Sequence, residues 1–127
     1  MLVESPHLNP DGPRPLREEE KALLAALLGR QADFHRLQEQ IATCNVCDMN
    51  DGGMGSIKFM VSDSRVFSTT LVKAEYLDYD EVLVSITVNA DEQGELYEVD
   101  FWKTDFSPLK RYPQPELVQI KIRGNPT

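Results

Sequence analysis

Apolar residues recur at helical spacing in the first third of the chain and alternate with polar residues after about residue 43. In LREEEKALLAALLGR, residues 16–30, leucines three and four positions apart form an apolar stripe behind three consecutive glutamates. Acidic residues favour the positive end of a helix dipole, and Gly29 is typical of a helix end. The pattern predicts one helix here and a second at about 32–42, where three apolar residues keep the spacing: Phe34, Leu37 and Ile41.

Short alternating segments in the rest of the chain predict strands. They are SIKFMV (56–61), STTLVKAEYLDY (68–79), EVLVSITVNA (81–90) and ELYEVDFWK (95–103). A last alternation over 118–122 predicts an edge strand. Two helices followed by such strands predict an α+β fold, in which two N-terminal helices pack on one face of an antiparallel meander sheet of about four to six strands.

The 127 residues suffice for one domain. Residues 1–15 contain four prolines, which disfavour helices and central strands, so we expect an extended or disordered arm before a single domain over 16–127. No apolar run reaches the roughly 18 residues of a membrane span, and the first residues lack the pattern of a signal peptide. We therefore expect a cytoplasmic protein.

The glycine-rich segment DGGMGSIKFM, residues 51–60, has two interpretations, a phosphate-binding loop or the turn of a β-hairpin. A Walker-type loop ends in Gly-Lys-Ser/Thr and opens a helix, whereas these glycines precede Ser56 and a β-prone run. Asp48 and Asp51 beside the loop would also repel phosphate. Glycine readily adopts the positive φ angles of a turn, so we expect a hairpin.

Cys44 and Cys47 have the CxxC spacing of some redox and zinc sites. A zinc site needs four ligands, and the chain offers only His7 and His35 to complete one, with no second CxxC. On a strand, residues three apart point to opposite faces, so the thiols would diverge. The spacing favours structural cysteines over metal or redox chemistry, and we expect no metal and no cofactor.

Catalytic chemistry has little support in the sequence. Neither histidine accompanies a serine or cysteine in a recognisable nucleophile setting, so we assign no catalytic residues. In ELYEVDFWKTD, alternation places Glu98, Asp100 and Trp102 on one face of the strand, opposite an apolar face. The first face is compatible with a solvated surface, a binding patch, or an acid-base or metal site, since one strand cannot demonstrate convergent carboxylates.

The net charge of −8 arises between Lys73 and Asp105, which contains ten acidic residues and two lysines. The segment includes an acidic corner formed by Asp78, Asp80 and Glu81. Such a field disfavours nucleic acid and anionic membranes, because both require neutralisation of phosphates by basic residues. It favours a basic protein partner, with solubility alone as the alternative.

Three segments resemble an uncharacterised family of small, acidic bacterial proteins: RPLREEEKALLAALLG, DMNDGGMGSIKF and GELYEVDFWKTDFSPLKRYP. The resemblance covers Arg14 to Pro113 and implies a bacterial origin and a single domain. It transfers no catalytic residues. By size, acidity and lack of a catalytic set, the chain is also similar to immunity proteins of bacterial polymorphic-toxin systems, which bind and block a cognate toxin domain.

Two functions follow as hypotheses. The first is a non-catalytic protein-binding module, an immunity protein in its most specific form, whose acidic strands and exposed aromatics contact a basic partner through Glu98, Asp100, Trp102, Asp78, Asp80 and Glu81. The alternative is a small-ligand-binding protein or enzyme with a pocket between helices and sheet, and with Asp100, Trp102 and Lys103 near its mouth. The sequence favours the non-enzymatic hypothesis and leaves the oligomeric state open, a homodimer included.

Overall fold

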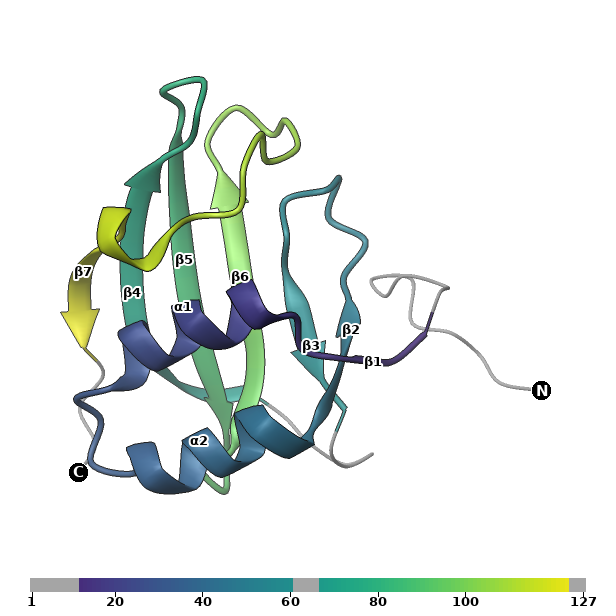
Figure 1. Ribbon diagram of the computed structural model, residues 1–127, viewed down its shortest axis with the longest axis vertical. Helices are drawn as coiled ribbons and strands as arrows, with labels where there is room; N and C mark the ends of the chain where they lie inside the picture. Colours follow the sequence, from purple (N-terminus) through teal and green to yellow (C-terminus); the bar gives the residue numbers. More distant parts are fainter. Residues whose placement is uncertain (1–11, 61–66, 124–127) are drawn as a thin grey trace.

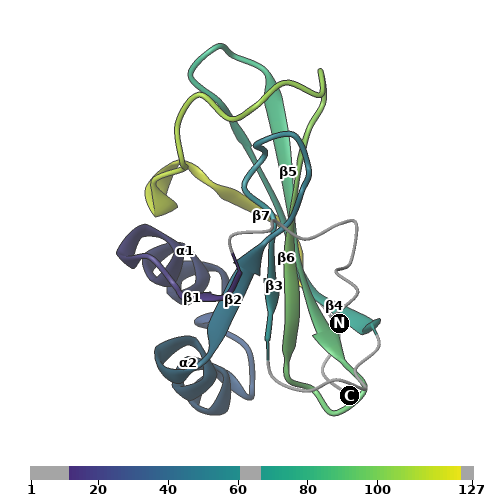
Figure 2. The same cartoon turned by 90° about the vertical axis from the view of Figure 1, so that its right-hand side faces the viewer.

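The computed structural model describes residues 12–60 and 67–123 and has two layers, an antiparallel sheet and a layer of helices on one of its faces (Figure 1, Figure 2). The elements are β1 (Arg14–Pro15), α1 (Glu18–Leu28), α2 (Phe34–Thr43), β2 (Asn45–Asp48), β3 (Ile57–Phe59), β4 (Phe67–Leu77), β5 (Leu83–Asp91), β6 (Leu96–Lys103), the 3-10 helix η1 (Pro115–Leu117) and β7 (Gln119–Arg123). This arrangement confirms the predicted α+β fold with both N-terminal helices on one face. The predicted arm falls mostly on residues 1–11, which lie outside the described residues.

Both helices form where the apolar spacing predicts them. α1 buries four leucines and α2 buries Leu37 and Ile41, which join the core of the sheet. The carboxylate of Glu20 accepts a hydrogen bond from the backbone N–H of Arg17 over 2.7 Å, which satisfies a donor at the start of α1. Gln40 exchanges two hydrogen bonds with the backbone of Leu96 and so ties α2 to β6. No helix in the described ranges is long and apolar enough to cross a membrane.

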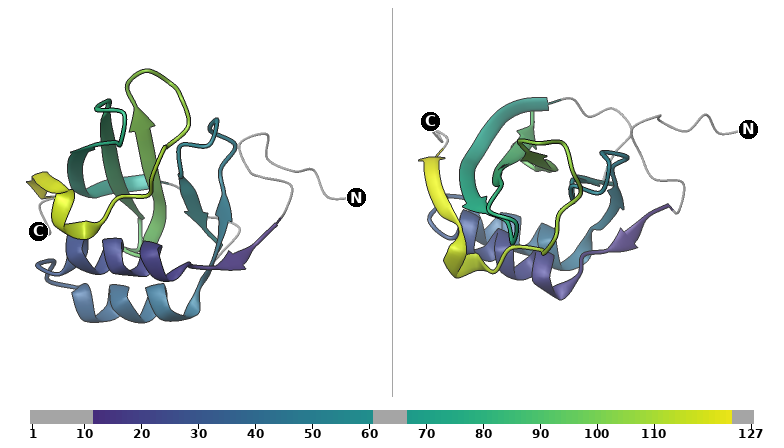
Figure 3. Two further views of the ribbon diagram at one scale, coloured as in Figure 1. Left: turned by 45° about the horizontal axis from the view of Figure 1, so that its top comes forward. Right: turned by 90° about the horizontal axis from the view of Figure 1, so that it is seen from above.

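The sheet contains seven strands in the order β1-β2-β3-β6-β5-β4-β7, and every neighbouring pair is antiparallel. Strands β4, β5 and β6 form the predicted meander. The order departs from a simple meander because β3 pairs with β6 instead of with β4. The strand count exceeds the predicted range because Arg14–Pro15 forms β1 at the sheet edge, where proline's missing N–H is tolerated. Seen from above, the sheet curls and β4 forms an arc (Figure 3).

The glycine segment joins β2 to β3, which pair in antiparallel register, so the predicted hairpin is confirmed. Three of its glycines have positive φ angles, between 78° and 99°. At Gly53 a Cβ atom would lie 3.2 Å from Pro108, and at Gly55 it would lie 3.1 Å from Leu109. The glycines therefore serve two purposes, since they permit the turn and allow residues 108 and 109 to approach it.

Arg14 connects three elements near the start of the described chain. Its guanidinium makes two hydrogen bonds to Glu20 in α1, both 2.8 Å, and two to Asp48 in β2, 2.7 and 3.1 Å. The hydrogen bonds from Arg14 are the main reason that the pKa of Asp48 is lowered. The buried Glu20 charge is thus balanced, and the segment that the sequence assigns to an arm is fixed to the domain from Arg14 onward.

The two cysteines occupy different kinds of position. Cys44 follows the last residue of α2 and donates its backbone N–H to Gln40, whereas Cys47 lies in β2 and is buried. Cys44 precedes β2, so alternation along the strand sets the direction of the Cys47 side chain but not that of Cys44. No disulfide joins Cys44 to Cys47.

Candidate functional site

The helices cover one face of the sheet and leave the other face of β4, β5 and β6 without a helical layer (Figure 2). We call this second surface the open face. The cross-strand register gives three of its rows: Leu77 beside Leu83, Glu75 beside Ser85 and Trp102, and Lys73 beside Thr87 and Asp100. Residues between these rows, such as Val84 and Ile86, are buried against the helices.

Trp102 is the largest side chain of the open face and is 49% exposed. Its indole ring meets the ring of Phe106 edge-on, with the centroids 4.8 Å apart. Phe106 itself is 65% exposed. Edge-to-face aromatic pairs contribute roughly 0.5–1.5 kcal/mol beyond their burial, so the pair orders both rings at the surface.

Leu77 and Leu83 extend this apolar surface. They face each other across β4 and β5 and are 60% and 37% exposed. Leu83 accepts a backbone hydrogen bond from Thr104, two residues beyond Trp102, so it lies diagonally next to the indole. Leu77, Leu83, Trp102 and Phe106 are referred to below as the Trp102 patch. Contiguous exposed apolar residues are more informative than isolated ones, because they mark interaction surfaces.

Backbone strain occurs at the same end of the molecule. Phe106 has a φ of 67° and Glu81 a φ of 65°, in the left-handed region that favours glycine. Both residues are exposed, Glu81 in the turn between β4 and β5 and Phe106 in the loop after β6. Strained residues cluster at functional sites, where the surrounding structure holds them in place.

Glu98, Asp100 and Trp102 all lie on the open face, as alternation predicts. Glu98 is opposite Lys58 of β3 and accepts a hydrogen bond from the side chain of Asn89. Asp100 is exposed, and no lysine or arginine of the described chain forms an ion pair with it. Desolvation first and the charge of Glu98 second raise the pKa of Asp100. Asp100 is therefore the acid of this face that a cationic partner can neutralise.

The acidic corner has a different role from the predicted one. The side chain of Asp78 is buried, and Lys103 Nζ donates to it over 2.8 Å and to Asp80 over 2.7 Å. Asp78 also accepts hydrogen bonds from the backbone N–H groups of Tyr79, Lys110 and Arg111. Asp78 is therefore not available to a partner. Asp80 is partly exposed, but its carboxylate is paired with Lys103. Of the three, Glu81 alone is free of the Lys103 cluster and exposed.

Lys103 lies on the opposite face of β6 from Asp100 and Trp102 and is fully buried. The third hydrogen bond from its ammonium goes to the backbone carbonyl of Pro108, 3.2 Å away. Burial by itself lowers the pKa of Lys103, but the bonds to Asp78 and Asp80 outweigh it and raise that pKa. The same bonds and those from the backbone offset burial and lower the pKa of Asp78. The cluster joins the β4–β5 turn to the loop after β6.

The acids of 73–105 do not form a single acidic face. Asp91 is buried in the turn between β5 and β6, where its carboxylate accepts the backbone N–H groups of Gln93 and Glu95. Glu92 and Glu95 lie in that turn, at the other end of the sheet from Glu81. On the open face, Glu75 and Glu98 have lysines beside them, Lys121 and Lys58. The uncompensated acidic charge at the Trp102 patch comes from Asp100 and Asp105.

Within residues 12–60 and 67–123 no group of three or more His, Cys, Asp or Glu side chains could hold a metal ion. The sequence alone did not reveal Phe106, Leu77 or Leu83 as surface residues. Leu77 is the last residue of β4 and Leu83 the first of β5, so periodicity could have placed them on the face of Trp102. Nothing local indicated that Phe106 would return to the indole, because that contact depends on the turn after β6.

The family model described as "Domain of unknown function (DUF6984)" matches residues 13–113. The chain belongs to the DUF6984 family. This match confirms the resemblance to an uncharacterised family, and it spans Arg14, the glycine loop, the Lys103 cluster and the Trp102 patch. Searches of curated proteins and of solved structures gave no significant match to the chain.

Proposed function

We propose that this DUF6984 protein is a non-catalytic protein-binding module of the bacterial cytoplasm, and that it binds a basic protein through the Trp102 patch. Asp100 and Asp105, beside the patch, supply the charge that selects a cationic partner, with Glu98 and Glu81 at its margin. The observation that carries the proposal is the exposed, ordered pair of Trp102 and Phe106 next to Asp100, whose carboxylate accepts a hydrogen bond from Ser56 but forms no ion pair within the described residues.

The energetics of the patch support this role. Tryptophan is enriched among the residues that dominate binding energies, since it buries a large area with little loss of conformational entropy. Holding Phe106 in the left-handed region costs of order 1–2 kcal/mol, and the exposed ring returns little burial within the monomer. A partner that covers both rings would recover that cost.

The charge of the patch supports a basic partner. A carboxylate whose pKa is raised is destabilised in its ionised form, and a cation placed against it removes that penalty. Asp105 has a lowered pKa because Ser107 donates two hydrogen bonds to it, so it stays ionised. Complementary charge of this kind increases the association rate.

The most specific form of the proposal is an immunity protein that blocks a basic bacterial toxin domain. Its support is the similarity of type in size and acidity, together with a contact surface that joins an aromatic anchor to unpaired acids. In this form Trp102 inserts into a groove of the toxin, and Asp100 faces its basic residues.

The test is a pull-down from the source bacterium followed by binding kinetics at two salt concentrations. We expect Trp102→Ala to increase the dissociation rate at least tenfold, because anchor residues act mainly on dissociation. We expect Glu98→Lys with Asp100→Lys to slow association and to reduce its salt dependence.

The matched control is Glu39→Lys with Glu92→Lys, which makes the same change in net charge away from the patch. Both glutamates are exposed, one on α2 and one in the β5–β6 turn. If this control slows association as much as the patch variant does, the total charge and not the patch governs binding. The proposal is contradicted if the recovered partner dissociates from the Trp102→Ala variant at the same rate as from the unmodified protein.

The small-ligand alternative needs a different location from the one predicted. Lys103 is buried on the helix side of β6, so it shares no pocket mouth with Asp100 and Trp102 on the open face. The structure does contain a cavity near Lys103, between β4 and the segment before η1.

A further inference from the structure

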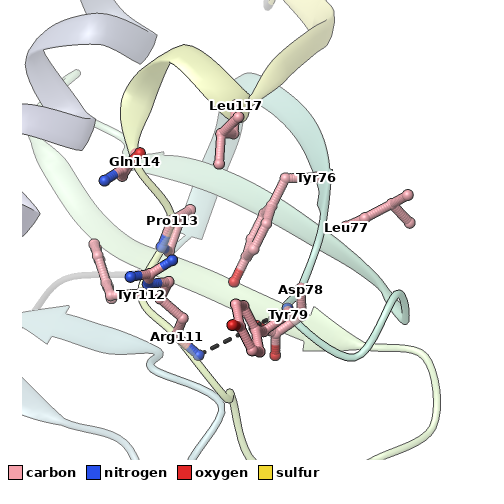
Figure 4. Close-up of a pocket in the computed structure, with 9 residues that line it drawn as sticks. All are labelled: Tyr76, Leu77, Asp78, Tyr79, Arg111, Tyr112, Pro113, Gln114 and Leu117. Carbon is pink, nitrogen blue, oxygen red and sulfur yellow. Dashed lines mark hydrogen bonds between the residues drawn. The ribbon is translucent and has the colours of Figure 1, made fainter.

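This cavity has a volume of about 270 Å³ and lies between the end of β4 and residues 111–117 (Figure 4). Its side chains come from both segments: Tyr76, Asp78, Tyr79, Arg111, Tyr112 and Gln114, with Leu77, Pro113 and Leu117 as the apolar ones. Ligand cavities usually measure roughly 300–1,000 Å³, so this one suits a small molecule.

Tyr76 contributes an unsatisfied polar group to the cavity. The residue is 5% exposed, and its hydroxyl is buried with no hydrogen-bond partner. It is the single buried side-chain polar atom in this condition among the described residues. In Figure 4 the ring extends from β4 toward the segment of Tyr112 and Pro113. A buried hydroxyl without a partner destabilises the folded protein, and a ligand acceptor would remove that cost.

The other polar groups of the cavity include one cation and several groups that can both donate and accept hydrogen bonds. Arg111 carries the cationic group and Gln114 an amide, and both side chains are exposed at the rim. Asp78 is the one carboxylate of the lining, and Lys103 and three backbone N–H groups already satisfy it. The Arg111 guanidinium lies over the Tyr79 ring, 5.5 Å from its centre. Arg111 therefore already occupies a ring face that could otherwise bind a cation.

We propose that the cavity binds a small organic carboxylate with an apolar body. The carboxylate accepts hydrogen bonds from the Tyr76 hydroxyl and the Arg111 guanidinium, and the body packs against Pro113 and Leu117. Because the Tyr76 hydroxyl is shielded, the exposed side chains of Tyr79 and Arg111 change rotamer as the ligand enters. Burial, and then the charges of Asp78 and Asp80, raise the pKa of Tyr76, which keeps the hydroxyl protonated as a donor.

A cationic ligand fits less well. The one negative group of the lining is already paired, and Arg111 occupies the face of Tyr79. An uncharged ligand would satisfy Tyr76 but would leave the guanidinium without a bound counter-charge. Leu77 lines the cavity and also belongs to the Trp102 patch, but the Tyr76 hydroxyl lies on the opposite face of the sheet from Trp102, so variants at Tyr76 and Trp102 test the two proposals separately.

The experiment is a titration of the labelled protein with three carboxylates, benzoate, 4-hydroxybenzoate and hexanoate, followed by amide NMR shifts. Each acid is compared with its own amide, which keeps the shape and removes the charge. We expect at least one acid to give saturable shifts at residues 76, 111, 112 and 117, and its amide to bind at least tenfold more weakly. Shifts that stay linear for all three acids overturn the proposal.

Variants separate recognition from structure. Tyr76→Phe removes only the hydroxyl, and Arg111→Gln removes the guanidinium with its charge, so each should weaken binding of the acid at least tenfold. Tyr97→Phe, outside the cavity, should leave it unchanged. Tyr76→Phe should also preserve or raise the thermal midpoint, since it deletes an unsatisfied group. A lower midpoint shows that an internal water satisfies the hydroxyl and overturns the proposal. Tyr76→Phe should leave partner binding intact, so the two proposals fail separately.

Discussion

Lys103 Nζ lies 2.8 Å from Asp78 Oδ2, and both side chains are fully shielded from solvent. The Lys103 ammonium has three N–H donors, and its three acceptors are Asp78, Asp80 and the carbonyl of Pro108. The contact holds two separate segments together, the β4–β5 turn and the loop after β6. The loop after β6 carries Phe106 of the Trp102 patch, and the β4–β5 turn contributes Asp78 and Tyr79 to the lining of the cavity.

Replacing this lysine should therefore destabilise the protein strongly. Lys103→Met keeps the length of the side chain but leaves Asp78 buried without its counter-charge, so we expect the thermal midpoint to fall by roughly 10 °C or more. Lys121→Met is the matched control, because Lys121 is exposed and 3.8 Å from Glu75. The control should shift the midpoint by no more than a few degrees. Equal shifts in calorimetry would contradict the role assigned to Lys103.

Asp100→Asn should have the opposite effect. A raised carboxyl pKa means that the folded state binds the proton more tightly than the unfolded state, so stability is gained as pH falls through that pKa. At pH 7 the ionised Asp100 opposes folding, and asparagine should raise stability by a few tenths of a kcal/mol. Urea denaturation at pH 7 and below pH 4 checks this, since the difference should vanish at the lower pH. A loss of stability at pH 7 would contradict the prediction.

At position 106, replacement by glycine should destabilise the protein less than replacement by alanine. Both changes remove the contact with Trp102, but only alanine keeps the left-handed strain at a φ of 67°. We expect Phe106→Gly to be more stable than Phe106→Ala by about 1 kcal/mol. At Thr104, which lacks a positive φ, the order should be reversed. Chemical denaturation of the four variants gives the comparison.

Alanine substitutions at Gly52 and Gly53 distinguish the cost of backbone strain from the cost of steric contact. Their φ angles are similar, 78° and 82°, but a Cβ at Gly52 has no atom within 4 Å, while one at Gly53 lies 3.2 Å from Pro108. Gly52→Ala should cost roughly 1 kcal/mol, and Gly53→Ala should cost clearly more. Equal losses in urea titrations would show that Pro108 moves away without cost.

Arg14→Met should destabilise the protein at pH 7 more than at pH 3. The lowered pKa of Asp48 means that its contribution is present above its unfolded pKa, about 3.9, and is lost as pH falls through the folded value. Removing Arg14 leaves the buried Glu20 with only the longer ion pair to Arg17, 3.6 Å away, so we expect a cost of about 3 kcal/mol at pH 7. Protonation of Asp48 should shrink that loss at pH 3. Urea unfolding at both pH values measures it, and a constant difference would contradict the account.

The helices, most of the strands and the alternation along β6 could be predicted from the sequence alone. These features depend on local periodicity, because a residue's face in a helix or strand follows from its distance to its neighbours along the chain. The positions of Glu98, Asp100 and Trp102 on one face are of this kind. So is the glycine hairpin, whose turn chemistry lies within a few residues.

Which acids remain free depends on contacts between segments that are distant in the sequence. Asp78 and Asp80 resemble a surface corner in the sequence, but Lys103, more than twenty positions later, pairs with both. The same holds for the pairing of β3 with β6 and for the edge strand at Arg14. Each depends on segments that folding brings together, and the free energy of such contacts comes from burial and charge pairing, which no local pattern records.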